Sequence, residues 1–169
     1  MPVPVMAWGR FGLLGLLVAL TGCPAGDQSP GLLIGTGEVE FEPVEDGDVL
    51  QVVRGPQGGY HILGSLLVKG VDAGDPNNLT SDRNPTMTFD VFRGGDSIIL
   101  LDSFTQGLDE APDSEGPYSH WLVGRFVVLD QSDTALDGET VTITARIDDV
   151  DGLSAEDEVT VELEPHPFN

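Results

Sequence analysis

The sequence has few of the residues that usually build catalytic or metal centres. Its 169 residues include one cysteine, Cys23, and three histidines, His61, His120 and His166. No His-Glu-x-x-His and no Gly-x-Ser-x-Gly motif is present, so neither a zinc protease nor a serine hydrolase of the usual kind is indicated. No cofactor is implied, and we expect a protein that is not an enzyme.

Two residue pairs are the nearest approach to chemistry. Ser119 precedes His120, but neighbouring residues of a strand point to opposite faces. His61 and His120 lie in two apolar stretches that could be adjacent strands, yet two satisfied core or edge histidines are the simpler interpretation. Neither pair predicts a site.

Basic residues are also scarce. Seven Lys and Arg face 29 Asp and Glu, for a net charge of −22. Such a chain repels phosphate backbones and anionic headgroups, so we expect no nucleic-acid partner and no attachment to a membrane by charge. Solubility is the simplest reason for the acidity, and a cation site is the alternative.

Long hydrophobic runs are absent as well. The apolar stretch 11–20 follows Arg10 and is shorter than the roughly 20 residues that a membrane span needs. It has the anatomy of a secretory signal peptide, starting at Met1 or Met6. A solitary thiol in an exported protein is unusual unless chemistry consumes it.

The end of this peptide, Leu20-Thr21-Gly22-Cys23, resembles the lipobox of bacterial lipoproteins. The resemblance implies that residues 1–22 are removed and that Cys23 carries fatty acyl chains, which anchor the protein in a membrane. The alternative is a small residue near an ordinary cleavage site. Pro24, where many such lipoproteins that stay in the inner membrane have aspartate, favours the outer membrane of the cell envelope.

Residues 23–36 contain Gly, Pro, Ser, Asp and Gln and are expected to form a flexible tether. The rest, 37–169, is expected to be one domain. Helical periodicity of useful length is missing, and period-two alternation or short apolar runs predict about eight strands. These features predict an all-β fold, a single antiparallel β-sandwich. The expected strands cover residues 38–42, 49–53, 60–71, 86–91, 98–101, 121–129, 140–147 and 159–163.

Within this pattern the run 121–129 is the most apolar and predicts a central strand. Alternation would place Trp121, Val123 and Val127 on one face, and we expect Trp121 in the core. The stretch 139–164 combines a Thr-alternating strand, an acidic Asp-Gly turn and a closing strand. It resembles the last hairpin of bacterial immunoglobulin-like and related surface domains, which implies an immunoglobulin-like sandwich. The paired cysteines of that family are missing.

Three loops are candidate binding sites. The glycine-rich loop 55–61 carries Gln57, Tyr60 and His61, which could contact a ligand such as a sugar, although a tight turn would explain the same residues. Asp148, Asp149 and Asp151 in the final turn are a weak candidate for calcium, against the simpler interpretation of a solvated acidic turn. Glu156 and Asp157 follow that turn and could add ligands, and a second acidic loop with Asp72, Asp75, Asn77 and Asn78 is another calcium candidate.

The sequence therefore indicates a lipid-anchored cell-envelope protein that serves as a binding or structural module. Its partner would be an envelope or extracellular protein or a glycan. The alternatives are a calcium-dependent adhesion or carbohydrate-binding domain, and an envelope enzyme without a recognisable motif.

Overall fold

A computed structural model describes residues 29–101 and 103–168 and is built almost entirely of strands. The all-β prediction is confirmed. The helical elements of the described residues are a single α-helical turn, α1 (Asp133–Leu136), and a 3-10 turn, Asp113–Glu115. The strands are β1 (Gly31–Thr36), β2 (Glu42–Pro43), β3 (Val49–Arg54), β4 (Tyr60–Lys69), β5 (Thr86–Arg93), β6 (Asp96–Ser97), β7 (Ser103–Thr105), β8 (Asp109–Glu110), β9 (His120–Leu129), β10 (Glu139–Asp148) and β11 (Ser154–Pro165).

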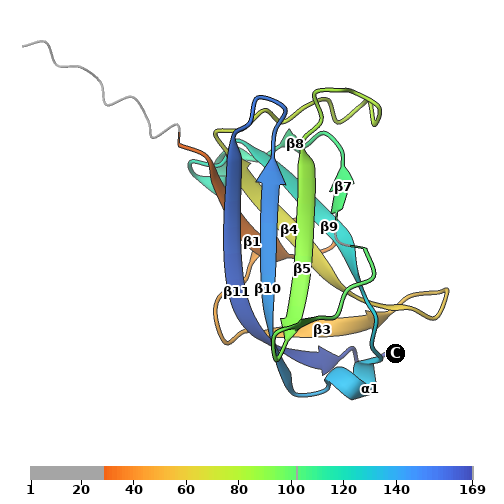
Figure 1. Cartoon of the computed structure of the whole chain (residues 1–169). Coiled ribbons are helices and arrows are strands. Elements are labelled where there is room, and N and C mark those ends of the chain that lie inside the picture. Colours follow the sequence, from red (N-terminus) through yellow and green to blue (C-terminus); the bar gives the residue numbers. More distant parts are fainter. Residues whose placement is uncertain (1–28, 102, 169) are drawn as a thin grey trace, which may run out of the picture.

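All of these strands belong to one mixed sheet that folds over on itself. The order β2-β1-β4-β3-β11-β10-β5-β6 forms its main path, with β9 on the other side of β4, β8 on β9 and β7 on β5. In Figure 1, β11, β10 and β5 lie side by side in front of β1, β4 and β9. The prediction of a purely antiparallel sheet is wrong at one place, because β3 pairs in parallel with β11.

Strand β3 links the two layers. Its first residues follow β11, from Val49 opposite Glu162 to Val52 opposite Pro165, and its last two, Val53 and Arg54, pair with β4. Because β3 changes partner along its length, β4 has no strand partner on this edge between the residues that pair with β3 and those that pair with β1. That opening shapes the candidate site.

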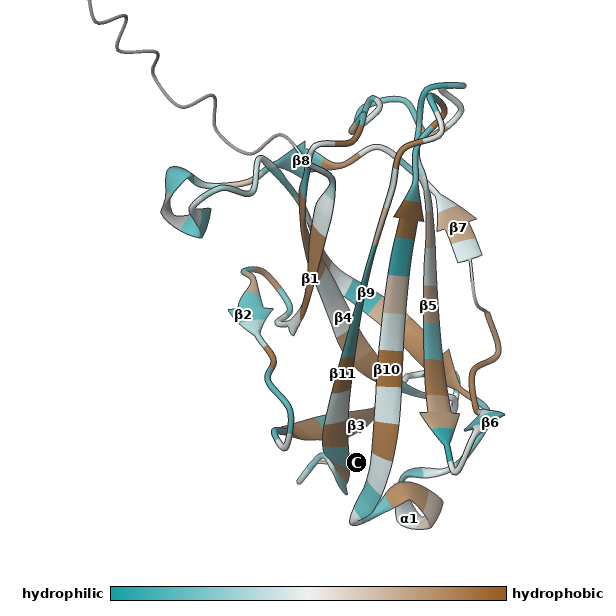
Figure 2. Cartoon of the chain, turned by 60° about the vertical axis from the view of Figure 1, so that its left-hand side comes forward, coloured by the Kyte–Doolittle hydropathy of each residue, from teal (hydrophilic) through white to brown (hydrophobic). Residues whose placement is uncertain are grey.

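The core lies between the two layers. Strand β10 shows the reason: Val141, Ile143, Ala145 and Ile147 are buried and alternate with threonines and Arg146. This alternation appears as bands of hydropathy along β10 in Figure 2. Period-two burial is what a strand with one face on a core requires, so the predicted final hairpin of β10 and β11 is confirmed.

Residues 31–36 are a correction to the predicted tether. They form β1, which pairs with β4 from Gly31 opposite Lys69 to Gly35 opposite Ser65. Leu32 and Ile34 are buried, and the Ile34 N–H donates to the Asp157 Oδ2 of β11 at 2.9 Å. The apolar residues that look like a short run in a tether therefore close one edge of the core.

The strand expected at 38–42 is also wrong. Residues 37–41 are not in a strand and Val39 is 82% exposed, while Glu42 begins the two-residue strand β2. The segment crosses the outer face of the sheet, where the carbonyl of Gly37 accepts a hydrogen bond from the buried Ser65 hydroxyl. The alternation of glutamates with Val39 and Phe41 therefore belongs to a loop and not to a strand. We call residues 37–41 the crossing loop.

Strand β9 forms where the apolar run predicted it, but its faces differ from the prediction. Leu122 and Val127 are buried in the core, whereas Trp121 and Val123 are half-buried on the outer face. The cause is an irregularity at Gly124, which has φ +69°, opposite a register shift between Gly64 and Leu66 of β4. An extra residue inverts the alternation beyond it, so Trp121 does not belong to the core.

Candidate functional site

The glycine-rich loop joins β3 to β4 as a tight turn. The Gly55 N–H donates to the Gly59 carbonyl at 2.7 Å, and the Gly58 N–H donates to the Gly55 carbonyl at 2.9 Å. Gly58 has φ +85°, a conformation that side chains resist. A tight turn is therefore enough to explain the glycines of this loop. The loop also holds Gln57 at its exposed tip.

The three predicted ligand residues of this loop come together. Gln57, Tyr60 and His61 line one shallow cavity of about 320 Å³, together with Phe126 and Val128 of β9. Tyr60 also packs against the core, and His61 is 7% exposed. The sequence prediction therefore identified three residues of this cavity and missed Phe126 and Val128.

Phe126 is the residue that sequence reasoning missed. Its ring lies 4.3 Å from the His61 ring, centroid to centroid, with the planes inclined at 34°. The side chain is nevertheless 57% exposed. It points outward because the irregularity at Gly124 moves it off the core face, and a glycine within an apolar run is the one sequence feature that could have suggested this.

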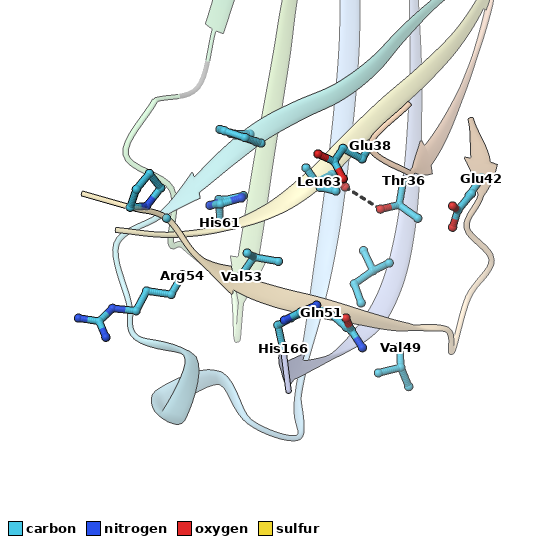
Figure 3. A pocket seen from close by; sticks show the side chains of 14 residues that line it. Thr36, Glu38, Glu42, Val49, Gln51, Val53, Arg54, His61, Leu63 and His166 are labelled. Atoms are coloured by element: carbon cyan, nitrogen blue, oxygen red, sulfur yellow. Dashed lines mark hydrogen bonds between the residues drawn. The ribbon is translucent and has the colours of Figure 1, made fainter. Parts of the chain in front are cut away.

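A second and larger cavity, of about 590 Å³, opens on the other side of His61 and Phe126. We call it the β3–β4 groove (Figure 3). Its volume is in the range of small-ligand sites, about 300–1,000 Å³. Its lining comes from β1, the 37–41 loop, β2, β3, the β3–β4 loop, β4, β9 and the residue that follows β11. The residues are Thr36, Glu38, Glu42, Val49, Leu50, Gln51, Val53, Arg54, Gly55, Pro56, His61, Leu63, Phe126 and His166.

Burial determines the charge of His61. Loss of solvent around the ring lowers its pKa below the ordinary histidine value. At neutral pH the ring is therefore neutral and offers one N–H donor and one acceptor nitrogen. Beside an exposed phenyl ring, such a group suits hydrogen bonding to an uncharged polar group of a ligand and provides no fixed cation.

The acidic turn after β10 has a different role from the one its composition suggests. One oxygen of Asp149 accepts hydrogen bonds from the N–H groups of Asp151 (2.9 Å) and Leu153 (2.8 Å), and the other accepts from the N–H of Asp72 (2.9 Å). These bonds, led by that from Asp72, lower the pKa of Asp149. The carboxylate therefore holds together its own turn and the loop that begins at Asp72.

The other two carboxylates of the calcium candidate have cationic partners. Asp148 accepts from Arg146 Nε at 2.8 Å, and Asp151 accepts from Arg83 at 2.9 Å. Arg83 also binds Asp72. Within residues 29–101 and 103–168 no group of three or more metal-ligating side chains is assembled, and the calcium site stays a prediction.

Of the two residue pairs that contain His120, the structure brings one together and keeps the other apart. His61 lies opposite Val128 and His120 opposite Val68, at the two ends of the β4–β9 ladder, so the two rings do not meet. Ser119 Oγ, however, lies 2.9 Å from His120 Nδ1, which corrects the expectation that these side chains point apart. Ser119 is exposed, and Asp72, the carboxylate whose charge interacts with His120, is already bound by Arg83 and the Gly74 N–H.

The predicted lipidation site, Cys23, and the signal peptide, residues 1–22, lie outside the described residues. In the part of the chain that is described, no helix has the length and apolar character to cross a membrane. Comparison of the chain with family models, curated proteins and solved structures finds no match. The residues of the groove are therefore the basis for assigning a function.

Proposed function

We propose that the protein is a lipid-anchored, non-enzymatic binding module of the cell envelope, and that its ligand occupies the β3–β4 groove. The observation that carries this proposal is the contact between Phe126 and His61. A large apolar ring exposed beside a nearly buried, neutral histidine and between two cavities is the arrangement expected of a ligand contact. Exposing the Phe126 ring to solvent adds nothing to the stability of the fold.

The proposed scaffold is an immunoglobulin-like β-sandwich. In such domains four strands A, B, E and D form one sheet and G, F and C the other. The pairings of β1, β4, β9 and β8 follow the first order, and those of β11, β10 and β5 follow the second. The parallel pairing of β3 with β11 is the addition that joins the two sheets.

The proposed anchor is the acylated Cys23, in the outer membrane. Cys23→Ser removes the chain's single thiol, so the variant should leave the membrane fraction or remain unprocessed. Fractionation with a mass measurement of the amino terminus tests this. A processed Cys23→Ser product that stays in the membrane pellet would overturn the lipoprotein proposal.

The groove is tested with the full mature chain in detergent, titrated with a panel of cell-wall glycans and short peptides. Phe126→Ala should weaken binding of the responding ligand about tenfold or more, as expected for a central contact. Leu79→Ala is the matched control, because Leu79 is 72% exposed and does not line the groove. Equal binding by both variants and the parent chain would contradict the proposed site.

A further inference from the structure

Strand β3 presents a free edge to the groove. On its other edge, the carbonyls of Asp48 and Val52 accept hydrogen bonds from the N–H groups of Glu162 (2.9 Å) and His166 (3.0 Å) of the β11 segment. Main-chain groups alternate in direction along a strand, so Leu50 faces β11 as Asp48 and Val52 do, and the residues on either side of Leu50 face away from β11.

These outward groups belong to Val49 and Gln51. The pairing of β3 with β4 covers Val53 and Arg54, and no other strand of the described residues pairs with this edge. Val49 and Gln51 both line the groove. Their N–H and C=O groups are thus available as hydrogen-bonding partners for an added chain.

Leu63 of β4 lies across the groove, between two ladders. Pairing of β4 with β3 stops at His61, and pairing with β1 begins at Ser65. In place of a strand, the Thr36 hydroxyl donates to the Leu63 carbonyl at 3.0 Å (Figure 3). The groove is therefore an interruption in the sheet, lined by main-chain groups that an extended segment can complete.

The charges around this interruption determine whether a positively or a negatively charged segment is favoured. Glu38 and Glu42 are exposed and line the groove, and Arg54 lies away from both of them in Figure 3. The whole chain has a net charge of −22, so its field attracts cationic partners and repels anionic ones. Phe126 and Leu63 add an apolar wall.

We infer, building on the proposed function, that the ligand is an extended and positively charged polypeptide segment, which adds as a strand to the free edge of β3. Its main chain pairs with Val49 and Gln51. An apolar side chain of the segment packs on Phe126, and a basic one lies near Glu38 and Glu42. Strand addition of this kind takes affinity from the main chain and specificity from alternate side chains.

The test uses two capped peptides, Lys-Val-Thr-Phe-Thr-Val-Lys and Glu-Val-Thr-Phe-Thr-Val-Glu, titrated calorimetrically into the mature chain. The lysine peptide should bind, more weakly at higher salt, and the glutamate peptide should not. Gln51→Pro deletes one N–H that faces the groove, while the proline sits on an edge that tolerates it. It should weaken binding about tenfold.

Gln51→Ala is the matched comparison, because it removes the groove-lining side chain and keeps the N–H, and it should weaken binding less than Gln51→Pro does. If Gln51→Pro alters the melting temperature, a lysine peptide N-methylated at alternate residues gives a second measurement on the unaltered protein. Loss of binding on methylation supports strand addition. Equal binding of the methylated and plain peptides, or of the two Gln51 variants, overturns it.

The two proposals fail in different ways. If neither peptide binds and a glycan binds in a manner that depends on Phe126, the groove is a ligand site and strand addition is wrong. If Phe126→Ala changes the binding of no ligand in the panel, the proposed function is wrong as well.

Discussion

At the scale of single residues, Asp149 links a turn that is local in sequence to a loop that is remote from it. Three main-chain N–H groups meet its carboxylate, and the residue is 9% exposed. Asparagine at this position keeps the shape but has one acceptor oxygen in place of two. We therefore expect Asp149→Asn to lower the free energy of unfolding by roughly 1–3 kcal/mol at neutral pH, as for buried donors that lose a partner.

The same substitution predicts a pH dependence. The hydrogen bonds lower the folded-state pKa of Asp149 below its unfolded value of about 3.9. The stabilisation is then complete above the unfolded pKa and is lost as pH falls through the folded pKa. Urea unfolding from pH 7 to pH 3 should show the parent and Asp149→Asn curves converging at low pH.

Asp82→Asn is the control for this experiment, because Asp82 is exposed and no comparable set of bonds is found at its carboxylate. A constant difference between parent and Asp149→Asn at every pH would mean that the carboxylate charge is not what the turn uses.

At the scale of elements, the irregularity of β9 decides which aromatic residue meets solvent. Gly124 has φ +69°, and a Cβ placed there would lie 2.5 Å from the Glu38 carbonyl oxygen. The same backbone shift turns Phe126 outward and lets the 37–41 loop approach the sheet. The groove therefore depends on a glycine that does not line it.

Gly124→Ala should consequently cost more than its backbone conformation alone. Gly94→Ala is a matched control, with φ +60° and open space around the added Cβ, and should cost about 1–2 kcal/mol. Gly124→Ala adds a clash with main chain, so its urea midpoint should fall further and ligand binding should weaken with it. Equal midpoints for the two variants would show that the crossing loop moves freely.

The elements also show how far the sequence could be interpreted. Alternation identified β10 and the second half of β11, residues 159–163, because the inner residues there are apolar. These strands could be recognised without knowledge of their partners. It misassigned residues 31–36 because β1 is short and follows Gly and Pro, and only its pairing with β4 and the Asp157 bond make it a strand. The periodicity of neighbouring residues carries no information about a contact between residues more than a hundred positions apart.

The candidate site was predicted in part for the same reason. The turn chemistry of the loop 55–61 is local, so Gln57, Tyr60 and His61 could be selected. Of these three, His61 lines the β3–β4 groove, whereas Gln57 and Tyr60 line the smaller cavity beside it. Phe126 and Glu38 reach the site through the register shift in β9 and the crossing loop. A one-residue shift inverts every face beyond it, and nothing in an apolar run states on which residue it occurs.

At the scale of the whole molecule, acidity is the dominant property. The net charge is −22 on 169 residues, so the acidic side chains repel one another in the compact state. In the described chain, Arg83 is held by Asp72 and Asp151, and Arg146 by Asp148 and Glu156. These pairs are largely exposed and contribute little on their own, but they engage three carboxylates of the calcium-candidate loops, Asp72, Asp148 and Asp151. Added salt of any kind should therefore stabilise the fold by screening.

Calcium and sodium should therefore stabilise the fold equally at matched ionic strength. If a weak calcium site existed, a concentration ten times its dissociation constant would add roughly 1.4 kcal/mol, or a rise of about 3–6 °C in melting temperature. We expect equal calorimetric melts in calcium, in chelator with matched sodium chloride, and for Asp151→Asn in either solution. Asp149→Asn cannot serve here because it weakens the turn itself. A calcium-specific rise that Asp151→Asn abolishes would contradict the expectation, because calcium would then have to displace Arg83 from Asp151, and it would favour calcium-dependent adhesion.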